Sequence, residues 1–391
     1  MLRIFCALVT GAAGLYAADL ALVGARIYPG PEASPIARGT VVIRGGRILS
    51  VEPGISKPAA GTKRVDCAGL VVMAGFWNCH VHFSEPKWEN AGSIPREQMA
   101  EYLREMFLRW GFTSVFDTGS FLGNTQAIAR RVEAGEIRGP MIRSTGEPFT
   151  SKDATPYYLH PLKLPELETT EQAVRMAGAR LDAGADAIKI FQGAWVAPGK
   201  VVPMRLDLVK AVAEVAHSRR KLLLAHPSNA AGLQSAIEGG VDVLTHLVEA
   251  PGDLDAMVVA QIKTRRMAVI PTLMLFGHND NLDQLIDQLS QLSDAGVQIL
   301  FGTDVGFLTD YDPLPEFRLL DRAGLNFPQI LACLTTNPCL RYGFSQGKGR
   351  VEPGMDADLV VLGGDPAEEV SAWTDVRYTI RKGEIAYSKS K

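Results

Sequence analysis

Residues 70–82, with the sequence LVVMAGFWNCHVH, form an apolar run that ends in two histidines. The run is rich in residues that favour β-strands, and alternate side chains of a strand point to the same face. His80 and His82 therefore share one face of the predicted strand, with Cys79 and Val81 on the other. Neutral imidazole is a favoured ligand of zinc and similar ions. The pair alone has two interpretations, a metal site or two ordinary histidines at the end of a strand, and it does not decide between them.

From about residue 73 onward, predicted strands alternate with predicted amphipathic helices. The strands are expected at residues 70–82, 113–117, 141–144, 185–191, 221–226, 241–246, 267–271 and 297–304. The helices are expected near 95–110, 124–134, 170–183, 205–217, 230–238, 254–263, 282–294, 315–323 and 328–335. Eight such units over 73–344 match the count and size of an α/β (β/α)8 TIM barrel. An open doubly wound sheet is the alternative, but no G-x-G-x-x-G follows a strand.

Both ends of the chain have a different pattern, with short strands and turns and no helical period. Residues 19–72 contain a hairpin signal at Gly45-Gly46, and residues 345–391 contain another at Lys382-Gly383. We therefore predict that the two ends pair into one small composite β-sandwich beside the barrel.

The first 18 residues resemble a secretory signal peptide. Arg3 precedes an apolar run, and Ala17-Ala18 offers small residues for cleavage. A buried N-terminal strand is the alternative interpretation. The signal predicts a periplasmic or secreted protein that begins near Asp19.

Composition excludes several classes of function. The chain has 391 residues, 47% of them hydrophobic, and a formal net charge of -3, so it lacks the basic footprint of a nucleic-acid-binding protein. No run after the signal approaches the ~18 apolar residues of a membrane span. We expect a small-molecule substrate and no stable membrane insertion once the signal is removed, and the sequence leaves a homo-oligomer open. Four cysteines outside the signal are expected to be buried thiols, although the spacing leaves a Cys333–Cys339 bridge open.

Polar residues recur at the predicted carboxyl ends of the barrel strands. Besides His80 and His82, these are Lys189, His226, His246 and Asp304. Active sites of such barrels lie at this end. Four of the seven histidines of the chain gather there, which predicts a metal site suited to Zn, Mn or Co.

Lys189 has two interpretations. A buried ammonium beside cations is unfavourable, and a neutral lysine reacts with carbon dioxide to give a carbamate that can bridge two metal ions. Alternatively, Lys189 pairs with Asp186. Spacing leaves both open.

The ordered set of motifs resembles the amidohydrolase superfamily, in particular imidazolonepropionase-like proteins and Xaa-Pro dipeptidases. The matching segments are His80-Val81-His82, Asp186-Ala187-Ile188-Lys189-Ile190, Ala225-His226-Pro227, Thr245-His246, Gly302-Thr303-Asp304, Thr336-Asn337-Pro338 and GMDADLVV at 354–361. The resemblance implies two divalent metal ions, expected to be zinc. One lies on His80, His82 and Asp304, another on His226 and His246, with carboxylated Lys189 between them. True imidazolonepropionases use one metal and lack this lysine, which favours the dipeptidase-like branch.

The chain departs from the dipeptidase pattern at three places. The histidine that often follows strand three in a Gly-Gly-His context is missing, and His160 is the candidate substitute. Leu247 follows His246 where relatives have another type of residue, and Cys339 replaces an alanine. We expect substrate contacts from Tyr157, Tyr158, His160 and Trp195 on the rim loops.

The expected reaction is hydrolysis of a C–N bond in an amide, cyclic amide or dipeptide. A hydroxide between the metals attacks the carbonyl, and Asp304 carries its proton to the leaving nitrogen. The alternatives are a mononuclear imidazolonepropionase-like hydrolase, a deaminase of a nitrogen heterocycle, and a catalytically dead binding protein. A deaminase of this type needs a glutamate as general acid three residues after the histidine of strand five. Here Pro227-Ser228-Asn229 follows His226, so that glutamate is missing. Retention of all six ligand positions argues against a dead protein.

Overall fold

The structure, a computed structural model, describes residues 19–249 and 254–390. The predicted signal peptide lies outside the described residues.

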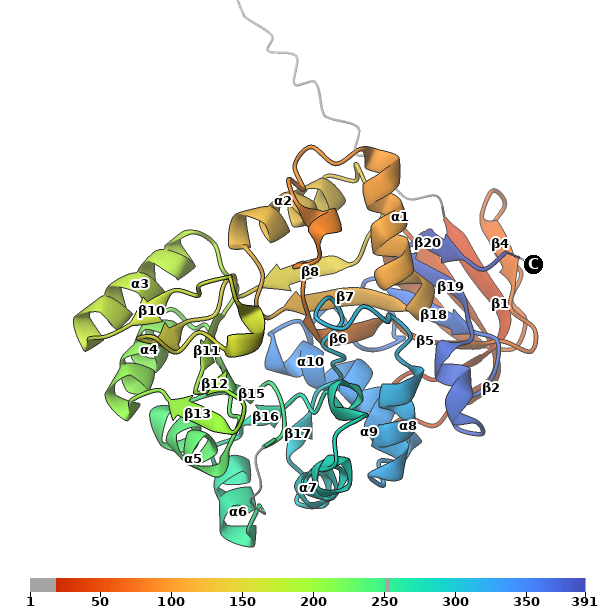
Figure 1. Cartoon of the computed structure of the whole chain (residues 1–391). Coiled ribbons are helices and arrows are strands. Elements are labelled where there is room, and N and C mark those ends of the chain that lie inside the picture. The colour runs from red at the N-terminus through yellow and green to blue at the C-terminus, as the bar shows by residue number, and fades with distance from the viewer. Residues whose placement is uncertain (1–18, 250–253, 391) are drawn as a thin grey trace, which may run out of the picture.

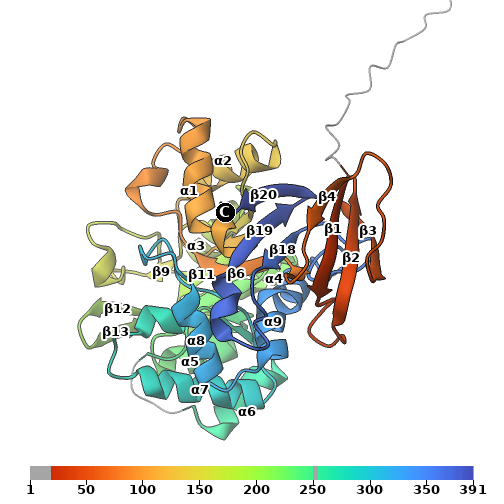
Figure 2. The same cartoon turned by 90° about the vertical axis from the view of Figure 1, so that its right-hand side faces the viewer.

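Strands from both ends of the chain form one hydrogen-bonded sheet at one side of the molecule (Figures 1 and 2). The N-terminal strands are β1 (Leu20–Ile27), β2 (Ile36–Arg44), β3 (Arg47–Pro53), β4 (Lys63–Asp66) and β5 (Val71–Ala74). The C-terminal strands are β18 (Leu359–Leu362), β19 (Val376–Arg381) and β20 (Glu384–Ser388). The two groups meet where β18 pairs antiparallel with β5, Val360 opposite Met73. The sandwich and its domain boundaries stay predictions, since these strands belong to a single sheet.

The apolar run at 70–82 is two strands, not the single strand that the sequence predicted. The chain leaves the terminal sheet after β5 and enters the parallel strands at β6 (Phe76–Val81). Gly75 stands between them, and a Cβ there would lie 2.3 Å from the Thr113 hydroxyl. The change of sheet needs a residue without a side chain, a requirement that hydrophobic periodicity does not reveal.

Eight parallel strands follow in the predicted order and form two sheets. The first contains β6, β7 (Phe112–Asp117) and β8 (Met141–Ser144). The second contains β11 (Ile188–Phe191), β14 (Leu223–His226), β15 (Val243–Leu244), β16 (Ala268–Val269) and β17 (Gln298–Ile299). Backbone hydrogen bonds link the sheets on both sides. Asp186 donates to Ser144 at 2.8 Å on one side, and on the other Cys79 donates to Phe301 at 2.8 Å and Asp304 to His80 at 2.9 Å. The architecture is α/β of the TIM-barrel type, but strand pairing within 19–249 and 254–390 does not close one continuous ring.

Amphipathic helices cover these strands. They are α1 (Arg96–Met106), α2 (Leu122–Glu133), α3 (Thr170–Asp182), α4 (Leu206–Ser218), α5 (Ala230–Gly239), α6 (Ala256–Thr264), α7 (Leu282–Asp294), α8 (Leu314–Arg322), α9 (Phe327–Leu334) and α10 (Thr336–Arg341). In α7, Leu285, Leu289 and Leu292 are buried at the spacing of one helix face. Across the described part of the chain, no helix combines the length and apolar character of a membrane span.

Two short pairings lie in segments that the sequence indicated only as loops. β9 (Thr150–Ser151) pairs with β10 (Glu166–Leu167), and β12 (Gly193–Ala197) forms a hairpin with β13 (Lys200–Pro203). Trp195 therefore sits in a strand, where its position is fixed.

The four described cysteines are free and buried, as predicted, and Cys333 and Cys339 are not bridged. Burial raises the pKa of both thiols to about 12, so they remain neutral at ordinary pH.

Candidate metal centre

All six predicted ligand residues line one cavity of about 330 Å³ at the carboxyl ends of the parallel strands. They are His80, His82, Lys189, His226, His246 and Asp304. Five of them are buried, and the side chain of His82 is 15% exposed. The barrel geometry thus brings together residues that lie up to 224 positions apart in the chain.

Strand alternation places the first two histidines as the sequence predicted. The His80 and His82 rings face the cavity with centroids 5.2 Å apart, while Cys79 and Val81 are buried in the core. Nε2 of His82 lies 2.8 Å from Oδ1 of Asp304, and Nε2 of His80 lies 3.4 Å from the same oxygen.

Asp304 reaches these rings because Asn78 ties the first strand to the segment that follows β17. The Asn78 amide donates to the Thr303 hydroxyl at 2.7 Å, and its oxygen accepts from the Thr303 backbone at 3.2 Å. The segments approach so closely that a Cβ on Gly302 would lie 2.9 Å from Cβ of His80. The glycine is therefore required by packing against the strand that carries His80.

His246 and His226 form the opposite side of the site, with ring centroids 4.3 Å apart. Nδ1 of His246 lies 2.6 Å from the Thr272 hydroxyl, and its Nε2 lies 3.9 Å from Oδ2 of Asp304. Nε2 of His226 instead lies 2.8 Å from Oε1 of Glu249. Glu249 also accepts a 3.1 Å bond from the Trp195 indole.

Lys189 is buried, and its ammonium group donates to the Thr245 hydroxyl. The alternative pairing with Asp186 is not formed, because Asp186 binds Arg143 at 3.1 Å and accepts from the Ser144 backbone. Burial lowers the pKa of Lys189 to about 7, against a smaller opposing effect of Asp304. A large share of this lysine is consequently neutral near pH 7.

Burial also lowers the pKa values of His80 and His246 well below the ordinary value, so both imidazoles are neutral. For Asp304, burial acts to raise the pKa, whereas the contact with His82 and the positive charge of nearby groups, Lys189 among them, act to lower it, and the net shift is downward. Neutral imidazoles beside a carboxylate are the protonation states that a divalent ion requires.

The residues present fit a metal ion. One ligand atom each from His80, His246 and Asp304 lie within 4.8 Å of one another, and all three residues are buried. Nδ1 of His80 is buried without a hydrogen-bond partner, and Oδ1 of Asp304 is buried with only imidazole nitrogens of His80 and His82 facing it. Unsatisfied buried polar atoms are costly, and an ion bound among these groups would remove part of that cost.

The predicted substrate contacts are distributed unevenly. Tyr158 lines the cavity, whereas Tyr157 and His160 are exposed residues outside its lining. Trp195 reaches the site through Glu249. His160 therefore does not take the place of the missing histidine after strand three.

Sequence reasoning missed Glu249, Thr272 and Phe307. Glu249 and Phe307 line the cavity, and Thr272 supports His246 from behind. They follow strand ends by a few residues, which is the one signal that points to them.

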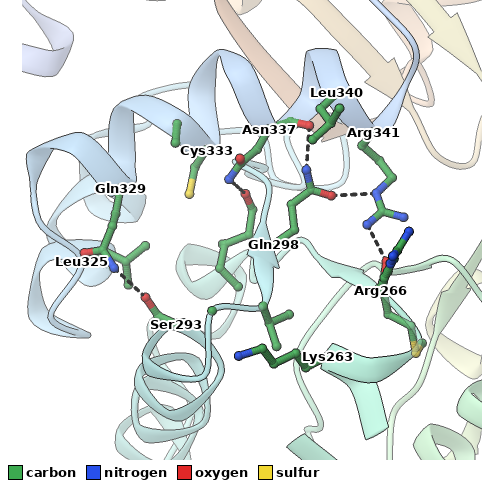
Figure 3. Close-up of a pocket in the computed structure, with 15 residues that line it drawn as sticks. Lys263, Arg266, Ser293, Gln298, Leu325, Gln329, Cys333, Asn337, Leu340 and Arg341 are labelled. Atoms are coloured by element: carbon green, nitrogen blue, oxygen red, sulfur yellow. Dashed lines mark hydrogen bonds between the residues drawn. The ribbon is translucent and has the colours of Figure 1, made fainter. Parts of the chain in front are cut away.

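A larger hollow of about 780 Å³ lies at the opposite, amino-terminal ends of β16 and β17. Figure 3 shows Gln298 joined there to Arg341 and to the Asn337 backbone. It contains none of the six predicted ligands. In barrels of this type that end serves stability, so the smaller cavity is the candidate site.

Comparison with known proteins gives a family and a fold. A family model described as the amidohydrolase family matches residues 71–386. An ochratoxinase of Aspergillus niger is 22% identical over 354 residues, covering 78% of this chain and 72% of that protein. An imidazolonepropionase of Thermoplasma acidophilum is 30% identical over 113 residues, 28% of each chain. A solved Xaa-Pro dipeptidase with bound methionine in its active site has a TM-score of 0.82 at 20% identity, covering 95% of this chain and 100% of that one.

Proposed function

This chain belongs to the amidohydrolase family and is a hydrolase acting on carbon–nitrogen bonds, and we propose that it cleaves an amide bond with the help of two divalent metal ions. One observation carries the proposal. Four histidines and an aspartate, residue types that bind such ions, converge with Lys189 on a single cavity at the carboxyl ends of the parallel strands. The similarity to an ochratoxinase and to a Xaa-Pro dipeptidase supports the proposal, although each of these activities is that of the similar protein.

We assign His80, His82 and Asp304 to one ion, expected to be zinc, and His226 and His246 to the other. Carboxylated Lys189 would be held between them. The burial of Lys189, its lack of contact with Asp186 and its lowered pKa support the carbamate, because a neutral amine is the form that reacts with carbon dioxide. When bound, such ions polarise a carbonyl and lower the pKa of a water molecule.

Asp304 is the proposed proton carrier. Its carboxylate faces the cavity and lies within 2.8–3.9 Å of three imidazole nitrogens. Its carboxyl group is ionised, and an ionised carboxylate at this position can accept a proton from the attacking water. The same group then delivers that proton to the leaving nitrogen, giving a carboxylic acid and an amine.

A second candidate is a deaminase, favoured by Glu249. The sequence lacks a glutamate just after His226, but the fold brings Glu249 to 2.8 Å from that ring. A deaminase needs a carboxyl group near its reacting ring, and Glu249 is the carboxylate available for it.

The test is a product assay on metal-loaded protein. Panels of N-acyl amines, N-acyl amino acids, dipeptides and nitrogen heterocycles are incubated with it, and new amine and free ammonia are measured separately. We expect amine without ammonia, and loss of activity after chelation with recovery when metal is restored. Ammonia from heterocycles would favour the deaminase. No product from any panel would overturn both candidates.

A further inference from the structure

The side chains that line the cavity indicate which substrates it accepts, a point that the family match leaves open. Apolar side chains make up most of its wall beyond the metal-ligating residues. Phe191 and Phe276 are buried residues of this wall, Leu275 lies beside Phe276, and Leu159, Leu162 and Leu164 come from the segment between β9 and β10.

The mouth of the cavity exposes large apolar groups. Tyr158, Leu162 and Phe307 are 38%, 39% and 47% exposed, and the rings of Tyr158 and Phe307 lie 5.8 Å apart. An exposed apolar cluster around a concave site marks a surface that binds an apolar partner. The substrate therefore presents an aromatic or aliphatic group to this rim.

Positive charge is scarce along the same wall. Among the described residues that line the cavity there is no arginine, and Lys189, at the ligand cluster, is the one lysine. A substrate carboxylate held inside the cavity against this wall would lose water without gaining a cationic side chain there, which is costly.

Negative charge, in contrast, is held in a fixed position. Glu249 contacts His226 at 2.8 Å and Trp195 at 3.1 Å, its backbone oxygen accepts from Asn281, and its side chain is 18% exposed. A carboxylate has about four acceptor positions, so capacity for a donor from the substrate remains. A nearby carboxylate repels an anionic group and attracts an ammonium or an N–H donor.

We propose, resting on the amide hydrolase activity proposed above, that the enzyme selects apolar amides that are neutral or cationic outside the scissile group, and that it discriminates against substrates with a free carboxylate. The scissile carbonyl must occupy the base of the cavity beside Asp304. The remainder of the substrate then passes between Glu249 and the aromatic rim.

The experiment uses three matched compounds and metal-loaded enzyme. They are N-benzoylphenylalanine, its carboxamide, and the analogue whose carboxylate is replaced by an aminomethyl group. Benzoic acid release gives kcat/KM for each. We expect the carboxamide to exceed the carboxylate by at least about tenfold, the scale of an uncompensated like-charge contact, with the amine at least equal to the carboxamide.

Two variants test whether the charge of Glu249 causes this substrate preference. Glu249→Gln keeps the size of the side chain and an acceptor for Trp195 but removes the charge, so the preference for amine over carboxylate should shrink. Glu85→Gln is the matched control, because Glu85 is held by Tyr311 and Lys87 outside the lining of the cavity, and it should leave the ratio unchanged. Preference for the carboxylate, or a ratio that Glu249→Gln does not move, would overturn the inference.

Failure of the proposed activity is distinguishable from failure of this inference. If none of the three compounds releases benzoic acid, binding of each to the metal-loaded wild type is measured by calorimetry. Binding that weakens from amine to carboxamide to carboxylate supports the selectivity and rejects only amide cleavage of these compounds. Tightest binding of the carboxylate overturns the selectivity itself.

Discussion

The Thr272 hydroxyl lies 2.6 Å from Nδ1 of His246 and donates its own hydrogen to the Pro271 carbonyl at 2.8 Å. A hydroxyl has one hydrogen, so towards His246 it must act as the acceptor. Nδ1 of His246 therefore carries the proton, and its Nε2, which faces Asp304, keeps a free lone pair. Thr272 thus fixes the tautomer that a metal ion requires.

Thr272→Val should weaken metal binding by a factor of about 10 to 100, the usual effect of losing such a supporting contact. Valine has nearly the same shape but cannot accept the proton of His246. Metal affinity is measured by competition with a chromogenic chelator. Thr272→Ser retains the hydroxyl and is the control, and equal affinities in the two variants would contradict this role.

Asp304→Asn should lower the rate by a factor on the order of 10² or more while much of the metal remains bound. The amide keeps an oxygen ligand but carries no proton between water and product. Asp304 has a left-handed backbone with φ 60°, which asparagine tolerates well, so the fold should persist. Rate and metal content are measured on one preparation. Near-normal turnover in a metal-replete variant would assign proton transfer to another group.

Elemental analysis of protein purified without chelator should give about two transition-metal ions per chain. The count rests on the proposed assignment of His80, His82 and Asp304 to one ion and of His226 and His246 to the other, with Asp304 also 3.9 Å from Nε2 of His246. A constant content near one ion with full activity would instead favour a mononuclear site.

The sequence predicted the six residues of the candidate centre because each lies in or within a few residues of the carboxyl-terminal part of a strand, and strand ends have a fixed place in a barrel. Supporting residues could not be predicted in this way. Thr272 acts through a hydroxyl in a left-handed turn, and Glu249 reaches His226 from 23 residues away. Such contacts depend on loop conformation, which has no periodic pattern. The break between two strands at Gly75 could not be predicted either. The chain changes from one sheet to another there, but the run of apolar residues continues without interruption.

Glu316 should make the stability of the fold depend on pH. It is buried in α8 and accepts a 2.6 Å bond from the Met274 backbone, and burial raises its pKa from 4.5 to about 8. Between pH 4.5 and about pH 8, Glu316 is therefore protonated in the folded state and ionised in the unfolded state. The free energy of unfolding therefore falls as the pH rises through this window, by up to about 1.4 kcal/mol per pH unit.

Glu316→Gln should remove this slope, because glutamine still accepts from Met274 and does not ionise. Urea unfolding across the same pH window compares the two proteins. The thiol of Cys333, which interacts with Glu316, has a pKa of about 12 and does not titrate there. Equal slopes in wild type and variant would show that Glu316 is ionised in the folded state.

Lys189→Ala tests the carbamate. The substitution removes the anion proposed to hold two ions together, so metal content should fall and activity should collapse, since two-metal sites place like charges ~3.5–4 Å apart. Formate, acetate or propionate could occupy the vacated space and restore part of the activity. Asp186→Asn is the control, because Asp186 binds Arg143 and not Lys189, and it should retain turnover.

The outcomes separate the two interpretations of this lysine. A lysine that acts as a cation predicts no rescue by an acid, because a carboxylate cannot replace an ammonium. An alanine variant that keeps both metals and its activity would refute the carbamate. If the variant is inactive and no acid rescues it, the wild type is exposed to isotopically labelled bicarbonate. A carbon resonance of a lysine carbamate, absent from the alanine variant, is then the expected result, and its absence from the metal-loaded wild type would contradict the assignment.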